Sequence, residues 1–402
     1  MKVVIVGANF HNKGAQSMLF TIVATLRRNY PNVKIFFAHW HNSPCLNENF
    51  LFDEIYYTRQ LFKVSSNKIS ISPPPPNAWY SIQKTFQTIR DADLIIDISG
   101  FALGSKWGIN RSLAYLNSVK VARAFNVPII LMPQSFGPFN FGEMQKVIDE
   151  EIISTLNYPK KIFAREYDGL IPLRQKYGLE NVSIHPDLVL ASPSVNPNDI
   201  FKTPPKFSVP KVLPESCVGM VPNLRSFDRS GNSWQTLQAF YEIINFLLKE
   251  GKLVYLFRHS VEDITPCRWL KSLFADDVRV ILWENDFSCF EYDEVCRQFD
   301  FMIVGRFHGI VHAYKNNVPC LLMGWAVKYQ ELASLMYQSQ YIFDLSAKEI
   351  NMREIFSAIH DMENNLDLNK KILSERLKQI QQSCSCFSAV NKILDKVAGG
   401  RS

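Results

Sequence analysis

Short apolar runs alternate with helical patterns along most of this chain. The clearest example begins with Phe301–Val304, a continuous apolar run typical of a strand that is buried on both faces of a parallel sheet. Apolar positions at helical spacing follow at 310–314, and a second run, Cys320–Met323, comes directly after Pro319. This order predicts a strand, a helix and a second strand parallel to the first.

The same alternation fills two halves of the chain, which predicts an α/β fold with two Rossmann-like domains and a cleft between them. The region 191–215 is rich in proline, serine and lysine, so we interpret it as a linker between a domain at 1–190 and a domain at 216–350. Residues 351–402 are expected to be helical, and the last helix can pack back on the first domain. Strands are predicted at 3–6, 33–39, 93–98, 127–133, 161–166, 181–184, 217–223, 252–259, 278–283, 301–304 and 320–323.

Two other segments have distinct patterns. After the first strand, a polar loop leads to a helix expected at about 16–29, and its glycines do not form the GxGxxG fingerprint of dinucleotide-binding proteins. The segment 72–77, SPPPPN, has four consecutive prolines, which predict an exposed polyproline II segment rather than a helix or a sheet interior.

Composition and charge narrow the class of protein. The chain has 402 residues, 47% of them apolar, which is ample for two cores. Its net charge is +6, and the basic residues are dispersed, which favours an anionic small molecule over nucleic acid. Eight cysteines without a CxxC pair indicate reduced thiols and no metal site. No secretory signal and no apolar run of about twenty residues is visible, so we expect a cytoplasmic protein without a transmembrane segment.

Basic residues follow predicted strands of the second half. Arg306 and His308 come directly after the strand at 301–304, and Lys328 follows the next strand. Ligands of open α/β sheets bind beyond the carboxyl ends of the strands, and a helix amino terminus favours an anion. The three residues therefore predict an anion-binding site, although each could instead cap a helix or form a surface ion pair. Arg225, after the first strand of this half, is a further candidate.

Polar residues at strand ends of the first half are also candidates. Asn9 and Asn12 lie in the loop after the first strand, where they could meet an anion or could only shape the turn. Gln134 follows a predicted strand as well. Asp97 lies within a buried strand, where it either accepts structural hydrogen bonds or faces the cleft as a base.

Several motifs, taken together, resemble the polysaccharide pyruvyl transferase family. They are GANFHNKGA, DLIIDISG, QSFGP, FAREYDG, HPDLVL and, most specifically, GRFHGIVHA followed by VPCLLMGWAVKY. The resemblance spans nearly the whole chain. It implies a GT-B-like architecture and transfer of a pyruvyl group from phosphoenolpyruvate to a saccharide as a ketal, without a further cofactor. The acceptor would belong to a cell-surface polysaccharide or its precursor, and a lipid-linked acceptor would bring the protein to the membrane surface.

The chemistry of this donor suggests roles for the candidates. Phosphoenolpyruvate carries a carboxylate and a phosphate, which suit Arg165, Arg225, Arg306 and Lys328. We expect His308 to act as general acid, and Glu166 or Asp97 to deprotonate the sugar hydroxyl. The motifs depart from the family pattern where Ala15 replaces an acidic residue and Ser99 replaces a glycine. Both departures lie in the first domain, the expected acceptor side, so the acceptor sugar stays open.

Two other functions stay open at this point. A GT-B glycosyltransferase with a nucleotide-sugar donor would use the same cationic strand ends for a diphosphate, and Glu331 could then bind the ribose. A glycan-binding protein that kept only the fold is the second alternative, but it would have little use for this concentration of charge.

Overall fold

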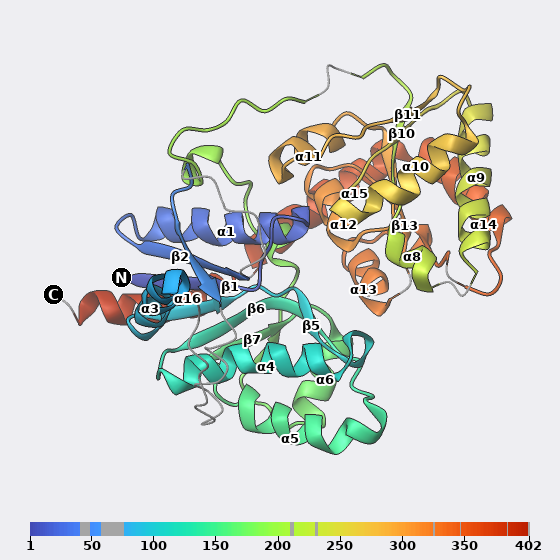
Figure 1. The fold of residues 1–402 in the computed structure, drawn as a ribbon. Coiled ribbons are helices and arrows are strands. Elements are labelled where there is room, and N and C mark those ends of the chain that lie inside the picture. Colours follow the sequence, from blue (N-terminus) through green and yellow to red (C-terminus); the bar gives the residue numbers. More distant parts are fainter. Residues whose placement is uncertain are drawn as a thin grey trace.

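The computed structural model describes residues 1–40, 49–57, 76–209, 213–229, 232–324, 326–345, 347–383 and 385–400. Two parallel sheets, each covered by helices, form two lobes joined by an extended segment (Figure 1). Three helices follow the second sheet in the chain. The predicted fold class, two Rossmann-like α/β domains with C-terminal helices, is confirmed.

The first sheet is built from strands that follow the predicted apolar runs. Its order is β3-β2-β1-β4-β6-β7-β8, with the short β5 paired to β6. All of these pairs are parallel, as expected for strands buried on both faces. The strands are β1 (Lys2–Val6), β2 (Lys34–Trp40), β3 (Asp53–Tyr57), β4 (Leu94–Asp97), β5 (Phe101–Leu103), β6 (Ile129–Phe136), β7 (Lys161–Ala164) and β8 (Val182–Ile184).

Helices cover both faces of this sheet. Val3 and Ile5 of β1 belong to the apolar cluster on the side of α1, whereas Val4 and Val6 point into the cluster on the side of α4 and α5. This alternation follows from the two-residue period of a strand. The helices are α1 (Lys13–Asn29), α3 (Pro76–Arg90), α4 (Ile109–Ala124), α5 (Gln145–Leu156), α6 (Tyr167–Gln175) and α7 (Leu188–Ala191).

The second sheet has the order β11-β10-β9-β12-β13-β14 and is also entirely parallel. Its strands are β9 (Cys217–Val221), β10 (Leu253–Leu256), β11 (Val280–Leu282), β12 (Phe301–Val304), β13 (Cys320–Met323) and β14 (Ile342–Phe343). The helices of this lobe are α8 (Leu224–Arg229), α9 (Ser233–Lys249), α10 (Ile264–Leu273), α11 (Cys289–Cys296), α12 (Phe307–Lys315) and α13 (Val327–Leu335). α14 (Met352–Asn364), α15 (Leu366–Ser383) and α16 (Phe387–Gly399) complete the chain.

One local prediction was wrong, and another is tested only at its last two residues. α1 begins at Lys13 rather than near Gln16, because the side-chain oxygen of Asn12 accepts hydrogen bonds from the amides of Gly14 and Ala15 and caps the helix. The proline segment at 72–77 lies mostly outside the described residues, but Pro76 and Asn77 open α3. Proline is compatible with the first turn of a helix, where its missing N–H is not needed.

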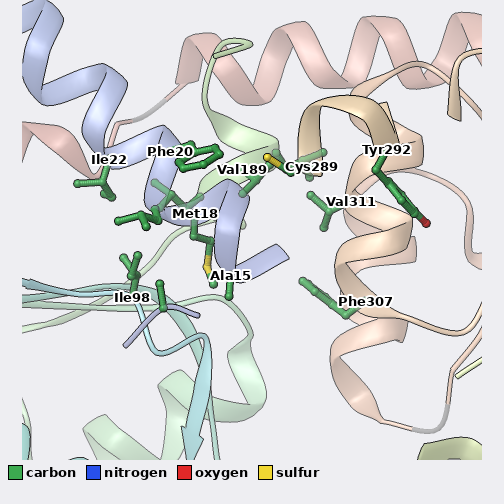
Figure 2. Packing of buried hydrophobic residues seen from close by; sticks show 14 of the residues in the cluster. Ala15, Met18, Phe20, Ile22, Ile98, Val189, Cys289, Tyr292, Phe307 and Val311 are labelled. Carbon is green, nitrogen blue, oxygen red and sulfur yellow. The ribbon is translucent and has the colours of Figure 1, made fainter. Parts of the chain in front are cut away.

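One apolar core joins the two lobes. Buried residues of β1 and α1 share a cluster with residues of α7, α11, α12, α15 and α16. Figure 2 shows Phe20 of α1, Val189 of α7, Cys289 of α11 and Val311 of α12 within this interface. The rings of Phe20 and Phe290 stack with centroids 5.5 Å apart. The two lobes are therefore in direct contact along one side.

The last helix returns to the first lobe. α16 lies beside the first sheet in Figure 1, and its buried Val390 and Leu394 belong to the same cluster as Val3 and Leu26. The hydroxyl of Tyr30 donates a 2.7 Å hydrogen bond to Asp395. The described helices include none with the length and hydropathy needed to cross a membrane.

Candidate functional site

A polar cavity of about 200 Å³ lies between the carboxyl ends of the two sheets. We call it the cationic cavity, because most of its polar side chains are basic. The loop after β1 and the first lobe supply Asn9, Asn12, Arg111 and Arg165, and the second lobe supplies Asn223, Arg225, His259, Arg306, His308 and Lys328. The structure thus brings together seven of the residues predicted from sequence, Asn9, Asn12, Arg165, Arg225, Arg306, His308 and Lys328.

Arg306 is held by two carboxylates. It precedes α12, and its Nε donates to Asp263 at 2.8 Å while Nη2 donates to Asp263 at 2.6 Å and to Glu262 at 2.5 Å. Burial disfavours the charge of Arg306, but Asp263 and Glu262 outweigh this effect and raise its pKa. Nη1 is the guanidinium nitrogen left for a ligand. Arg306 is therefore a rigid cation whose charge is already largely compensated.

His308 lies between the two lobes. Its Nε2 is 3.3 Å from a carboxylate oxygen of Asp187, which follows β8 in the first lobe. Burial lowers the pKa of His308, and Asp187 opposes this shift. Burial would raise the pKa of Asp187, but His308 and Arg165 hold it well below its usual range. The pair therefore consists of an ionised carboxylate that orients an imidazole at the cavity wall.

Gly14 makes room for this imidazole. A Cβ atom at Gly14 would lie 2.2 Å from Cγ of His308, far inside van der Waals contact. The glycine of the GANFHNKGA motif thus serves a close approach between α1 and α12 rather than a dinucleotide turn.

Arg165 is buried and connects several first-lobe groups. Nη1 donates to Asp187 at 2.8 Å, and Nη2 donates to the carbonyl of Gly100 at 3.1 Å and to Ser135 at 2.7 Å. Its guanidinium carbon also lies 4.5 Å from the ring centroid of Phe307. These bonds fix Arg165 as a positive charge in the wall of the cavity.

Lys328 is the least compensated of the predicted cations of the site. Its ammonium lies 5.1 Å from the ring of Phe101, 5.4 Å from that of Phe307 and 5.5 Å from that of Tyr329. Within the described parts of the chain it makes no hydrogen bond and no ion pair. Burial, with help from the nearby Arg165, lowers its pKa to about 7, while Glu166 opposes the shift. An anion in the cavity would stabilise the charged form of this lysine.

Arg225 is the most exposed of the predicted cations. Its Nε and Nη2 donate to Glu262 at 3.1 and 2.9 Å, so it shares a carboxylate with Arg306. It lies at the rim, where solvent weakens its interaction with a ligand.

Asp97 and Gln134 are placed differently from the sequence prediction. Both are buried, and neither lines the described wall of the cationic cavity. Asp97 accepts hydrogen bonds from the amide and hydroxyl of Ser99 and from Gln134 at 3.3 Å. Strand β6 continues through Gln134 to Phe136, so this side chain is inside the sheet rather than beyond its end. The geometry gives both residues structural hydrogen bonds, and burial raises the pKa of Asp97 to about 6.

Glu166 lines a second cavity of about 530 Å³ that shares Arg165, Phe307 and Lys328 with the first. It is buried and accepts a 2.9 Å hydrogen bond from Ser135. Burial raises its pKa, and Arg165 opposes the shift. The exposed rings of Tyr167 and Tyr337 and the guanidinium of Arg376, which lies over Tyr337, form the far side of this second cavity.

Sequence reasoning missed several residues of the site, two of which position the predicted ones. Asp187 and Asp263 carry the ion pairs of His308, Arg165 and Arg306, and His259 lies in the cavity wall. The signal that could have found them is a charged residue beside a buried run, as in HPDLVL and RHSVED.

A family model described as polysaccharide pyruvyl transferase matches residues 12–326. This range includes every predicted site residue except Asn9, which lies just before it, and Lys328, which lies just after it. The chain belongs to the polysaccharide pyruvyl transferase family. It is accordingly a member of a family of transferases. No curated protein matches it.

Solved structures resemble this family member in fold at low sequence identity. The UDP-GlcNAc 2-epimerase of Methanocaldococcus jannaschii has a TM-score of 0.53 at 10% identity, covering 90% of this chain and 92% of that chain. The UDP-GlcNAc 2-epimerase of Neisseria meningitidis bound to UDP-GlcNAc has a TM-score of 0.52 at 11% identity, covering 99% and 100%. UGT71G1 of Medicago truncatula complexed with UDP-glucose has a TM-score of 0.54 at 11% identity, covering 98% of each chain. They show that the pyruvyl transferase family member has a GT-B-like fold.

Metal-ligand geometry in the described residues occurs only at Glu250, His360 and Glu363. None of these lines either cavity of this family member.

Proposed function

We propose that this protein transfers a pyruvyl group from phosphoenolpyruvate to two hydroxyls of a saccharide, forming a ketal. The observation that carries the proposal is Lys328, a cation without a hydrogen-bonding partner in the described structure, at the wall that the two cavities share. Together with Nη1 of Arg306 and the rim residues Arg225 and Arg111, it suits a small ligand with two anionic groups. Family membership supports the same donor class.

The reaction needs two proton transfers and no redox change. The methylene carbon of phosphoenolpyruvate gains a proton and becomes a methyl group, while two acceptor oxygens form bonds to C2. The bond from C2 to the phosphate oxygen breaks, and inorganic phosphate leaves. One of the two hydroxyl protons accounts for the hydrogen added to the methyl group, and the other accounts for the proton on the leaving phosphate.

We assign the donor and the acceptor of this reaction to different cavities. In the proposal the donor occupies the cationic cavity, where its negative charge and Asp187 favour the protonated form of His308. This imidazolium, oriented by Asp187, is the acid that protonates the methylene carbon. The acceptor enters through the second cavity, where Glu166 serves as the base, since a raised pKa suits a base near neutral pH. Asp97 is not used, because its oxygens are bonded inside the first lobe.

Sugar transfer from a nucleotide sugar is the alternative, favoured by the UDP-sugar complexes among the similar folds. The hydrogen bonds of Glu331 argue against a nucleotide-sugar donor. Both oxygens of Glu331 accept hydrogen bonds from the amino terminus of α6, 2.7 Å from the amide of Tyr167 and 3.0 Å from that of Asp168. A ribose would have to displace these bonds.

Turnover with isotopically labelled donor tests the proposal. The protein is incubated with phosphoenolpyruvate carrying ¹³C at the methylene carbon and a panel of glycosides, and NMR follows the label. A new methyl signal on a glycoside, together with inorganic phosphate, is expected for the wild type and not for His308→Gln. Turnover of a UDP-sugar, with phosphoenolpyruvate unchanged under all acceptors, would move the protein to the alternative.

A further inference from the structure

His259 is the one fully buried side chain among the described residues whose two ring nitrogens both lack a hydrogen-bond partner. It follows β10, at the carboxyl edge of the second sheet, and it lines the cationic cavity. The edge of its ring contacts Tyr292, with centroids 5.1 Å apart, and His312 lies at 5.6 Å. Apolar and aromatic contacts hold the ring, but none of them satisfies its nitrogens.

Buried polar groups without partners are rare and costly, so this histidine needs an explanation. The same short segment supplies Glu262 and Asp263, which fix Arg306. Its Ser260 also pairs with Asn12 across the lobes, and the amide of Val261 donates to the carbonyl of His11 at 3.2 Å. Contacts with both lobes therefore fix the position of this segment. In this position His259 faces the cavity, and its lack of partners does not result from a shift of the segment.

His312 shows what a structural histidine looks like in the same region. Its Nε2 lies 3.1 Å from the hydroxyl of Ser17, and its Nδ1 lies 2.6 Å from Asp293. Both nitrogens are satisfied, Nε2 by Ser17 across the interface between the lobes and Nδ1 by Asp293 of the same lobe. Both rings are buried and neighbouring, but only His259 lines the cationic cavity and only His259 lacks partners for both nitrogens.

We infer that His259 is a ligand-binding residue of the cationic cavity, whose ring N–H donates to a phosphate oxygen of the bound donor. Burial, more than the neighbouring basic groups, lowers its pKa well below the ordinary value, so the ring is neutral and carries one N–H. The neutral N–H group of His259 would add a directional hydrogen bond to a site in which the other proposed ligand-binding groups, such as Arg306 and Lys328, are charged. The identity of the donor as phosphoenolpyruvate rests on the proposed function.

The test compares His259→Phe with His312→Phe by thermal unfolding, with and without phosphoenolpyruvate. Phenylalanine preserves the ring but has no polar atoms. We expect the ligand-free His259→Phe protein to melt at or above the wild-type temperature, because the unpaired nitrogens are gone. Its affinity for phosphoenolpyruvate should fall by about tenfold or more, which corresponds to one hydrogen bond to a charged group. His312→Phe should melt lower without ligand, because it removes the contacts of both ring nitrogens with Ser17 and Asp293.

Two results would overturn the inference. Wild-type affinity in His259→Phe would show that the ring does not contact the ligand. A lower melting temperature of the ligand-free protein in both His259→Phe and His259→Gln would assign the ring a structural role. If the wild type responds to UDP and not to phosphoenolpyruvate, the proposed donor is wrong, and the same comparison made with UDP then decides the role of His259.

Discussion

At the scale of single residues, the charges of the site differ in how far the protein itself compensates them. Arg306 and Arg165 are each paired with two carboxylates, whereas Lys328 is surrounded by aromatic faces. A bound anion therefore gains little binding free energy from the two arginines, because it would have to displace their carboxylate partners. It gains most from approaching Lys328. We therefore expect the pH dependence of anion affinity to come from Lys328.

We expect the affinity for phosphoenolpyruvate to fall as the pH rises above about 7, the pKa of Lys328. Binding needs the protonated lysine, so the dissociation constant should increase up to about tenfold per pH unit above that value. A phosphate monoester has a second pKa of about 6, so it is already mostly ionised above pH 7. The titration of Lys328 can therefore be separated from that of the ligand. Calorimetric titrations between pH 7 and 9 measure this slope. An affinity that does not change over this range would mean that Lys328 does not bind the anion.

Gly14→Ala should abolish turnover without unfolding the protein. The added methyl group meets His308 and must move it away from Asp187. We expect a loss of about 100-fold or more in turnover, the usual contribution of a general acid. Labelled-donor turnover and thermal unfolding measure the two properties.

The control for that variant is His308→Gly, because Cβ of residue 308 would itself lie 2.4 Å from the added methyl group and an alanine would keep it. In the His308→Gly background these side-chain clashes are absent, so adding Gly14→Ala should cost nothing further in turnover and should not destabilise α1, where alanine is the better helix former. Equal losses in both backgrounds would contradict the role given to Gly14.

At the scale of elements, short helices and loops set the position of the catalytic candidates. Asp187 caps α7, with one oxygen 2.9 Å from the amide of Val189, while its other oxygen faces Arg165 and His308. One carboxylate thus joins a helix terminus, a buried cation and the proposed acid.

Asp187→Ala should lower the free energy of unfolding by about 1 kcal/mol more than Asp187→Asn, because asparagine still caps a helix and alanine does not. Both variants lose the charge that orients His308, so both should lower turnover. Chemical denaturation gives the difference in stability. Equal stabilities of the two variants would contradict the capping role.

The strands of the sheets were predictable from their apolar runs, and so were the basic residues beyond their ends. Several elements were not, among them the strands β3, β5 and β14 and the helix α3. β3, with the sequence DEIYY, is too short and too polar to give a clear pattern, and α3 opens within a proline run. The ion pairs of the site were equally invisible, because Asp187 and His308 are 121 positions apart in sequence and no periodicity encodes their contact. Gln134 was misplaced because β6 runs further than its apolar stretch. For Asp97, the structure agrees with the structural alternative, since its oxygens accept hydrogen bonds inside the first lobe.

At the scale of the whole molecule, the two lobes share a core on one side and the cavities on the other. α1 contributes to both, since its buried face packs on α11 and α12 while its amino terminus reaches the cationic cavity. The site is therefore assembled only when the lobes are in contact.

We expect the protein to unfold in a single calorimetric transition, with a van't Hoff enthalpy equal to the calorimetric one. Separation of the lobes would expose the apolar residues of α1, α11 and α12 together, which makes independent unfolding unfavourable. Phe20→Ala should lower the midpoint of that one transition. Two resolved transitions, only one of them shifted by Phe20→Ala, would show that the lobes are independent.

The central claim is that the cationic cavity binds phosphoenolpyruvate through Lys328. Isothermal titration calorimetry of phosphoenolpyruvate at pH 6.5 tests it, with Lys328→Met and, as a matched control, Lys160→Met, an exposed lysine just before β7 that does not line either of the two site cavities. We predict one binding site per chain in the wild type and in Lys160→Met, and a loss of binding in Lys328→Met. Binding that survives in Lys328→Met, or no binding by the wild type, would contradict the account.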